Sequence, residues 1–315
     1  MKIVFMGTPK FAVPSLEMLI KEGQDVLAVV TQPDKPKGRG NKLCAPPVKE
    51  FALEHGIEVL QPSKIKTPEF VEQIRALGPD LLITAAYGKI LSKDLLEVPA
   101  LGCINVHGSL LPAYRGAAPI HWAIINGETT TGITTMFTDV GLDTGDILLK
   151  KELSITPDIT VGELHDEMAI LGAEVLKSTL TELVKGSLER KPQDDVLSSY
   201  APILSKEHGL IDWSKTAQQI HNLVRGIDPW PGAFTFMNGN RMRIWSTSLA
   251  SYEDSSKETG LAIGEIAEVN NDGIWVKCSD GCILVKEVQF DSSKRMSIGD
   301  YIRGHRIDVG EKLGK

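Results

Sequence analysis

Residues 2–23, KIVFMGTPKFAVPSLEMLIKEG, decide the fold class because they join a strand to a helix through a glycine turn. The apolar run over 3–6 is typical of a parallel strand buried on both faces. A helical pattern follows over 11–21 and stops at Gly23, since glycine readily adopts the left-handed conformation that ends helices. The turn lacks GxGxxG spacing and Pro9 removes an amide donor, so we expect a strand–helix unit of an α/β sheet and no NAD site.

The same alternation of strand and helix continues through the first part of the chain. Further buried strands are predicted over 26–31, 81–85 and 103–106, and helices over 47–54 and 69–77. This rhythm predicts a doubly wound α/β sheet with right-handed crossovers. The remaining elements of this part are a hairpin-like pair of strands and a long helix, over 131–139, 146–154 and 161–185.

The chain changes character after residue 186. Residues 186–199, GSLERKPQDDVLSS, are polar and typical of a linker. A helix is predicted over 217–226, and short alternating runs follow, separated by hairpin signals such as Asn238-Gly239 and Asp280-Gly281. These runs predict a small antiparallel β-barrel. The expected organisation is a first domain over 1–186, a linker over 187–204 and the barrel domain over 205–315.

The composition is that of an ordinary globular protein, with 42% hydrophobic and 24% charged residues among 315. The 34 Lys and Arg against 41 Asp and Glu give a net charge of -7, so contact with nucleic acid requires a local basic patch. No apolar run approaches the ~20 residues that span a bilayer, so we expect a cytoplasmic protein without membrane association. Cys278 and Cys282 supply two ligands where structural zinc takes four, so we expect no metal.

The densest polar cluster is INVHGSLLPAYR, over 104–115. Asn105 and His107 are two residues apart, so they share one face at the carboxyl end of a strand, where open α/β sheets bind ligands. Asp143 lies in a glycine-bounded loop, VGLDTGD, over 140–146. Taken alone, the histidine is a structural hydrogen-bonding residue and the loop is a solvated turn. Taken together, the three side chains indicate a catalytic cleft.

These residue types favour one kind of chemistry. Asn and His supply donors for an oxyanion, and an Asp beside a His fixes the orientation of the ring. No Ser or Cys lies in an exposed elbow such as GxSxG, which disfavours a covalent acyl-enzyme. The set therefore predicts direct acyl transfer between two bound substrates.

Several stretches of the chain carry a resemblance to a known family. They are FMGTPKFAVPSLEML (5–19), TQPDKPKGRGNKL (31–43), AAYGKIL (85–91), INVHGSLLPAYRGAAPIHWAI (104–124), DVGLDTGDIL (139–148) and RGIDPWPGAF (225–234). Through them essentially the whole chain resembles the 10-formyltetrahydrofolate-dependent formyltransferases, and among these the methionyl-tRNA formyltransferase family. The resemblance implies a Rossmann-like doubly wound sheet followed by a small antiparallel β-barrel that resembles the OB-fold.

The resemblance also implies roles for particular residues. The family's catalytic Asn, His and Asp fall on Asn105, His107 and Asp143. The implied folate-binding residues are Ser109, Leu110, Leu111 and Pro112, with Tyr87, Ile90 and Leu91 lining the same pocket. The implied reaction transfers a formyl group from 10-formyltetrahydrofolate to the amino group of methionyl initiator tRNA, with both bound as substrates to a monomer and without a metal.

A basic loop over 32–42, QPDKPKGRGNK, supplies the expected tRNA contacts. By composition it is a solvated flexible connection, but it matches the tRNA-contacting loop of the family. The implied tRNA-binding residues are Lys35, Lys37, Arg39 and Lys42 in this loop, and Arg303 and Arg306 in the barrel together with Arg241 and Arg243.

Other functions share parts of this pattern. A formyltransferase acting on an aminosugar nucleotide is the closest alternative, because HGSLLPAYRG also fits that class. A formyltetrahydrofolate hydrolase would use water as the acceptor. Glycinamide ribonucleotide transformylases lack the C-terminal barrel as a family, and the intact Asn, His and Asp set disfavours a non-catalytic tRNA-binding protein.

Overall fold

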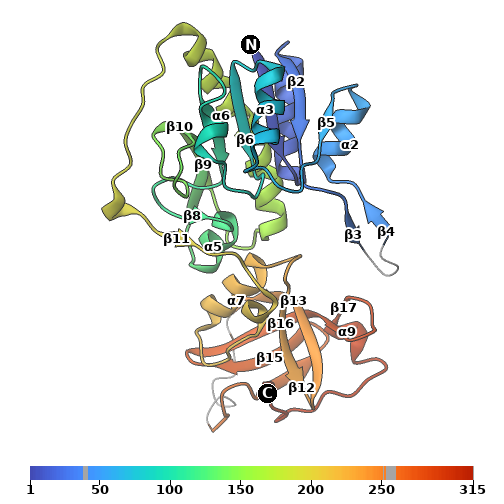
Figure 1. Cartoon of the computed structure of the whole chain (residues 1–315). Coiled ribbons are helices and arrows are strands. Elements are labelled where there is room, and N and C mark those ends of the chain that lie inside the picture. Colours follow the sequence, from blue (N-terminus) through green and yellow to red (C-terminus); the bar gives the residue numbers. More distant parts are fainter. Residues whose placement is uncertain (38–41, 251, 253–259, 315) are drawn as a thin grey trace. The chain divides into compact units, whose positions relative to one another are not determined.

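The computed structural model describes residues 1–37, 42–250, 252 and 260–314 (Figure 1). Within these residues the chain divides into two compact units. Unit 1 holds Met1–Pro119, Thr130–Ser154 and His165–Pro202. Unit 2 holds Ile120–Thr129, Ile155–Leu164 and Ile203–Lys315. The units are therefore interleaved in the sequence.

The central sheet of unit 1 has the strand order β10-β9-β7-β6-β1-β2-β5. Its strands are β1 (Lys2–Gly7), β2 (Asp25–Val30), β5 (Val59–Leu60), β6 (Leu81–Ala85), β7 (Cys103–His107), β9 (Thr130–Phe137) and β10 (Ile147–Ser154). Neighbouring strands run parallel from β7 to β5, whereas β9 and β10 form an antiparallel hairpin beside β7. The predicted doubly wound sheet and its hairpin-like pair are confirmed.

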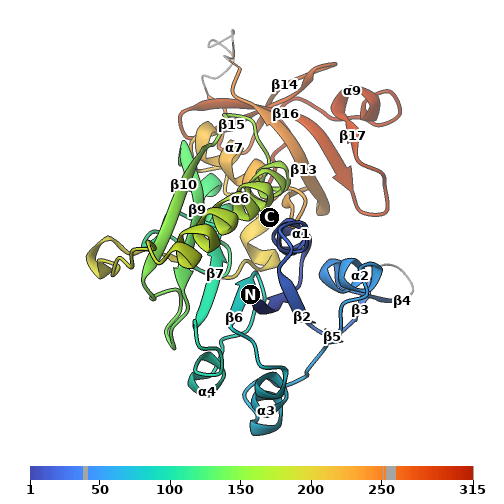
Figure 2. The ribbon, with the colours of Figure 1, turned by 90° about the horizontal axis from the view of Figure 1, so that it is seen from above.

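Helices cover both faces of this sheet. Figure 2 shows α3 and α4 on one face and α1 and α6 on the other. The helices of this part are η1 (Lys10–Ala12), α1 (Val13–Lys21), α2 (Pro47–Glu54), α3 (Pro68–Leu77), α4 (Lys93–Leu96), α6 (Val161–Lys185) and η2 (Asp195–Leu197). On the α3 face, Phe70 and Ile74 pack with Val4, Met6 and Leu82 in one buried cluster. The apolar runs of the sequence are thus the buried strands and helix faces of this core.

Two small pairings lie outside the main sheet. Strands β3 (Lys35–Lys37) and β4 (Lys42–Cys44) form an antiparallel hairpin where the sequence predicted a loop. Strand β8 (Arg115–Gly116) pairs in parallel with β11 (Tyr200–Ala201). Residues 191–201, which contain β11, are called the strap below. The strap begins at Lys191, which bridges to Ile147 of β10.

Unit 2 is built on an antiparallel sheet of order β12-β13-β16-β15-β14, with β17 paired to β16. Its elements are α5 (Pro119–Ile125), η3 (Lys206–Gly209), α7 (Ala217–Gly226), β12 (Ala233–Met237), β13 (Asn240–Ser248), β14 (Ile266–Asn270), β15 (Gly273–Cys278), β16 (Gly281–Phe290), β17 (Met296–Ser297) and α9 (Ile298–Tyr301). Near the C-terminus, Leu313 bridges Met237 at one edge of the sheet and Lys312 bridges Glu265 at the other. These bridges close the sheet, which confirms the predicted small barrel.

Helix α5 packs closely against α7 within unit 2. A Cβ atom added at Gly226 would lie 2.8 Å from Cγ1 of Ile125, so only glycine permits this approach. Asn222 of α7 likewise lies beside Gly127, just after α5. The helix that follows the polar cluster in sequence is thus a core element of unit 2.

Candidate functional site

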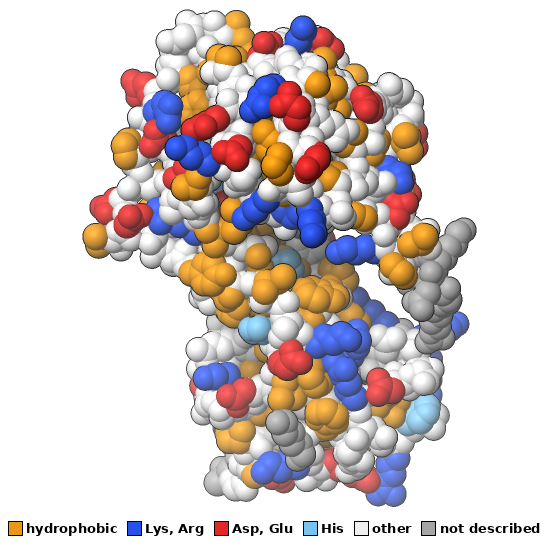
Figure 3. All heavy atoms as spheres, viewed as in Figure 1, with side chains coloured by type: hydrophobic (Ala, Val, Ile, Leu, Met, Phe, Trp, Pro, Cys, Tyr) orange, Lys and Arg blue, Asp and Glu red, His pale blue; other side chains and the backbone are white. Residues whose placement is uncertain are grey.

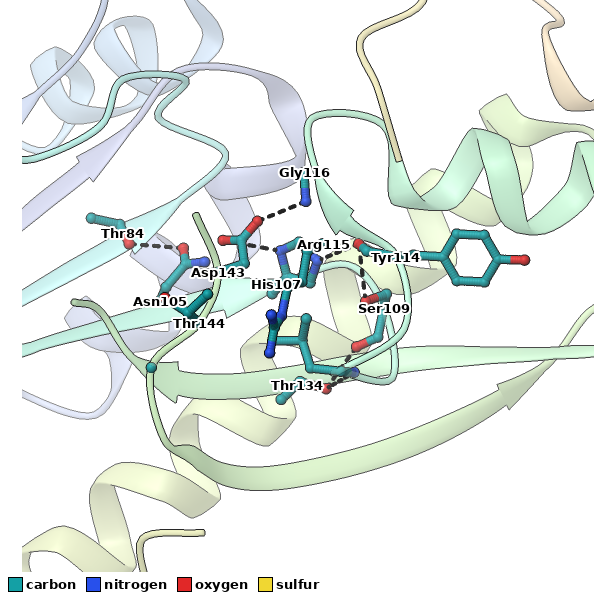
Figure 4. A network of polar contacts seen from close by, with 12 residues as sticks. Thr84, Asn105, His107, Ser109, Tyr114, Arg115, Gly116, Thr134, Asp143 and Thr144 are labelled. Atoms are coloured by element: carbon teal, nitrogen blue, oxygen red, sulfur yellow. Dashed lines mark hydrogen bonds and ion pairs between the residues drawn. The ribbon is translucent and has the colours of Figure 1, made fainter. Parts of the chain in front are cut away.

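Asn105 lies on β7 and is paired with Thr84 of β6, near the carboxyl ends of both strands. The Thr84 hydroxyl donates a hydrogen bond of 2.8 Å to Oδ1 of Asn105 (Figure 4). Because this bond uses the amide oxygen, the amide group of Asn105 has a fixed orientation, with Nδ2 on the side of Asp143 (Figure 4). Asn105 therefore offers N–H donors at the edge of the sheet.

His107 ends the same strand and is 5% exposed. Its Nε2 lies 3.0 Å from the carbonyl oxygen of Tyr114. A carbonyl oxygen only accepts hydrogen bonds, so Nε2 carries the proton in this arrangement. Nδ1 faces Oδ1 of Asp143 at 3.7 Å, which is longer than a hydrogen bond. Nδ1 thus faces a carboxylate and keeps its capacity to bond a substrate.

Two residues at the site, Asp143 and Tyr114, have a left-handed backbone conformation. Asp143 has φ 56° and Tyr114 has φ 60°, values that cost roughly 1–2 kcal/mol for residues other than glycine. The Tyr114 conformation presents its carbonyl to His107, and the Gly116 N–H donates to Oδ2 of Asp143 at 2.8 Å. The surrounding hydrogen bonds therefore maintain two strained residues at the site.

Figure 4 shows Asn105, His107 and Asp143 on neighbouring elements at one edge of the sheet. These three residues are called the Asn–His–Asp trio below. The trio combines amide donors, an imidazole and a carboxylate, which suits stabilisation of a developing oxyanion. Its catalytic role stays a prediction at this point.

The expected folate-binding segment, residues 109–112, has a firmly held backbone. The Thr134 hydroxyl donates to the Ser109 carbonyl at 2.7 Å and accepts from the Leu111 N–H at 3.1 Å. Ser109 Oγ donates to the Ala113 carbonyl at 2.6 Å, and Lys150 Nζ donates to the Leu111 carbonyl. Burial lowers the pKa of Lys150. The side chains of this segment divide between buried Ser109 and Leu111 and half-buried Leu110 and Pro112.

The residues expected to line the same pocket lie in two environments. Tyr87 and Leu91 are 4% exposed and belong to the buried cluster beneath α3, whereas Ile90 is 51% exposed. The Tyr87 hydroxyl is buried and has no hydrogen-bond partner among the described residues, and burial raises its pKa to about 12. Their part in folate binding stays a prediction.

The expected tRNA-binding residues lie on two parts of the chain. Lys35 is exposed on β3, Lys37 and Lys42 belong to β3 and β4, and Arg39 lies outside the described residues. On unit 2, Arg303 pairs with Asp300 at 3.0 Å and Arg306 with Asp308 at 2.5 Å, all exposed. Each of these barrel arginines is therefore partly neutralised by an acid.

Other arginines of the barrel lie against aromatic rings. The Arg241 guanidinium lies 3.8 Å from the centre of the Phe234 ring. Arg243 and Arg295 lie 5.8 and 5.3 Å from the centre of the Trp245 ring. Figure 3 shows Lys and Arg side chains beside hydrophobic ones on the visible face of unit 2. Such a surface combines positive charge with flat apolar rings.

Several residues at the site have no distinctive signal in the sequence. Thr84 lies within the mostly apolar run 81–85, where nothing distinguishes it from a core residue. Gly116 contributes only its backbone N–H. Gln193 and Ser199 belong to the polar stretch predicted as a linker, yet both bond the site loops. A polar linker composition gives no hint of such contacts, because they join residues far apart in the sequence.

Across the described residues, no group of three or more His, Cys, Asp or Glu side chains is placed to hold a metal ion. No helix in the described part of the chain is long and apolar enough to cross a membrane.

Comparisons with known proteins identify the family. Models of the formyl transferase family and of the formyl transferase C-terminal domain match residues 1–180 and 203–306. The chain is 75% identical to the methionyl-tRNA formyltransferase of Ruminiclostridium cellulolyticum and 59% identical to that of Acetivibrio thermocellus, with 100% of each chain covered. The solved structure of WlaRD, a sugar 3N-formyl transferase, has a TM-score of 0.67 at 21% identity over 93% of this chain and 99% of its own. The chain therefore belongs to the formyl transferase family, and within it to the methionyl-tRNA formyltransferases.

Proposed function

We propose that the protein transfers the formyl group of 10-formyltetrahydrofolate to the amino group of methionyl initiator tRNA. The observation that carries this proposal is the Asn–His–Asp trio at the carboxyl edge of the sheet, with each side chain held by a neighbour. Full-length similarity to relatives named methionyl-tRNA formyltransferase supports the choice of acceptor.

In the proposed reaction the neutral amine of methionyl-tRNA attacks the formyl carbon, and the carbonyl oxygen becomes an oxyanion. Asn105 Nδ2 donates to that oxygen, because Thr84 holds the other end of the amide. Protonated His107 adds a second donor through Nδ1, since Nε2 is already bonded to the Tyr114 carbonyl. Preorganised donors of this kind lower the barrier because they need no reorientation during the reaction.

Protons must move for the reaction to finish. Formation of the new carbon–nitrogen bond releases one proton from the amine, and cleavage of the bond to folate N10 requires one proton on N10. Asp143 faces His107 at 3.7 Å and stabilises the imidazolium, and it relays the proton from the amine through water to N10. The products are N-formylmethionyl-tRNA and tetrahydrofolate, and no metal takes part in this scheme.

We propose that residues 109–112 bind the pterin ring. Leu110 and Pro112 are half-buried and closely follow β7, the strand that carries Asn105 and His107, so they offer apolar contact. The backbone is fixed by Thr134 and Lys150, so a bound ring would meet a preformed edge. Tyr87, Ile90 and Leu91 complete the proposed folate-binding set, with Ile90 the exposed member.

We propose that the β3–β4 segment and the barrel bind the tRNA. The segment brings Lys35, Lys37, Arg39 and Lys42, and the barrel brings Arg303 and Arg306. The domain organisation stays a prediction, with a folate domain over 1–186, a linker over 187–204 and a tRNA-contacting barrel over 205–315. The monomeric state and the cytoplasmic location also stay predictions. Arg39→Ala should raise KM for tRNA and leave folate affinity unchanged, because loss of one phosphate contact weakens only RNA binding.

An acceptor screen tests the proposed function. The protein is supplied with 10-formyltetrahydrofolate and one of three acceptors, namely methionyl initiator tRNA, an aminosugar nucleotide or water. Formylation of the tRNA, lost in Asn105→Ala, is the expected result. Formylation of the sugar alone would replace this proposal by the aminosugar alternative, and formate release alone would indicate a hydrolase.

A further inference from the structure

Gln193 connects the strap to two other segments of unit 1. Its Nε2 donates to the carbonyl oxygens of Asp143 and Gly145, each at 2.8 Å. Its Oε1 accepts from Nε and a terminal nitrogen of Arg115, at 3.0 and 2.9 Å. All the hydrogen-bonding capacity of the amide group is thereby used by two segments, the loop that contains Asp143 and the β8 strand that contains Arg115.

The chemistry of the partners fixes the orientation of this amide. Arg115 only donates and backbone carbonyls only accept, so a flipped Gln193 would meet like groups on both sides. The Arg115 side chain is 12% exposed and also bonds Asp195 of the strap at 2.8 Å. Arg115 therefore holds the oxygen of Gln193, and the nitrogen is left facing the Asp143 loop.

The Asp143 loop needs such support. Asp143 has a left-handed backbone at φ 56°, which an isolated loop would leave readily. A donor on the Asp143 carbonyl stabilises that conformation and thereby sets the direction of its carboxylate toward His107. The strap also fixes the loop that orients His107, because Ser199 Oγ accepts from the Tyr114 N–H at 2.8 Å.

We infer that Gln193 is a positioning residue for formyl transfer, and that it acts through the backbone of Asp143. The inference rests on the proposed function, because it assumes that the Asp143 carboxylate takes part in the reaction. Among the described contacts, Gln193 bonds the backbone carbonyl of Asp143, while the Asp143 carboxylate contacts His107 and the Gly116 N–H. Its removal should therefore lower kcat and leave KM for both substrates nearly unchanged.

Gln193→Glu is the sharpest test. Glutamate has the same shape and keeps the contact with Arg115, but it replaces the donor by an acceptor that repels both carbonyls. We expect kcat to fall on the order of 10- to 100-fold, the usual cost of misplacing a reacting group slightly. A near-normal kcat in this variant would show that Gln193 only anchors Arg115. If the glutamate variant folds poorly, Gln193→Met replaces it as the test. Methionine is similar in size, carries no charge and also lacks the donor, so the same loss of kcat is expected.

A double-mutant cycle separates positioning from general damage. In an Asp143→Ala background, Gln193→Glu should lower kcat no further, because the residue it positions is gone. Losses that multiply would overturn the inference. Val196→Ala is the matched control, since this strap side chain is 89% exposed, and it should keep full activity. Inactive wild-type protein would refute the proposed function, whereas active wild-type protein with an active Gln193→Glu variant refutes the positioning role alone.

Discussion

Thr84→Val tests how much the orientation of the Asn105 amide contributes to catalysis, because the variant keeps the amide and removes the group that orients it. Valine keeps the shape of threonine in the buried strand but removes the hydroxyl that donates to Oδ1 at 2.8 Å. A neutral hydrogen bond contributes about 0.5–1.5 kcal/mol, so kcat should fall by about 2- to 13-fold if the whole bond is used to orient the amide. Asn105→Ala, which removes the donor itself, should cost ~10²–10³-fold. The assay is formylation of methionyl-tRNA at saturating donor, with kcat and KM measured separately.

Thr84→Ser is the control for this prediction. Serine keeps the hydroxyl and loses a buried methyl group. It should lower the free energy of unfolding by about 0.8 kcal/mol, seen as a lower melting temperature, and leave kcat near normal. Valine should lower kcat, whereas serine should not, although both variants lose some stability. Equal kcat in the wild type and the valine variant would refute the orienting role of Thr84.

Other consequences can be checked directly. Each single alanine variant of the trio should lower kcat at least ~10²-fold. The fall in kcat of the triple variant should be far smaller than the product of the three single falls. Single-turnover rates measure both. Gly145→Ala should lower both kcat and melting temperature, because its Cβ would lie 1.8 Å from the Phe137 carbonyl oxygen, whereas Gly186→Ala meets open space at φ +70° and should cost only ~1 kcal/mol of stability. Burial lowers the pKa of His221 below its usual value of 6.5 in the folded protein, so the unfolded chain binds a proton more readily than the folded one. The free energy of unfolding should therefore fall as the pH drops below about 6.5. Urea unfolding of His221→Gln should show a weaker dependence on pH.

The fold could be predicted closely where the signals are local. The helices Pro47–Glu54, Val161–Lys185 and Ala217–Gly226 are predicted to the residue, since apolar spacing and glycine stops act within a few positions. The β3–β4 hairpin is different. Its strands are only three residues long, KPK and KLC, so they are too short to show the apolar alternation that marks a strand, and only their pairing reveals them.

The candidate site shows the same division. Asn105 and His107 could be singled out because two residues on one strand share a face. Gln193 could not, because its partners, two backbone carbonyls and the Arg115 side chain, lie 48 to 78 positions away and no spacing rule connects them to Gln193. Polar composition predicts a linker, and it carries no information about which distant groups that polar stretch will bond.

The packing of α5 against α7 has a consequence for biosynthesis. Chains emerge from the ribosome with the N-terminus first, so α5 is made long before the helix that Gly226 allows to approach Ile125. Until α7 emerges, Ile125 of α5 lacks the partner against which it packs in the folded protein, although the strands before and after α5 in the sequence belong to unit 1. The packing of α5 is therefore completed only after about a hundred further residues have been made, so unit 2 cannot finish folding before the strands of unit 1 are available.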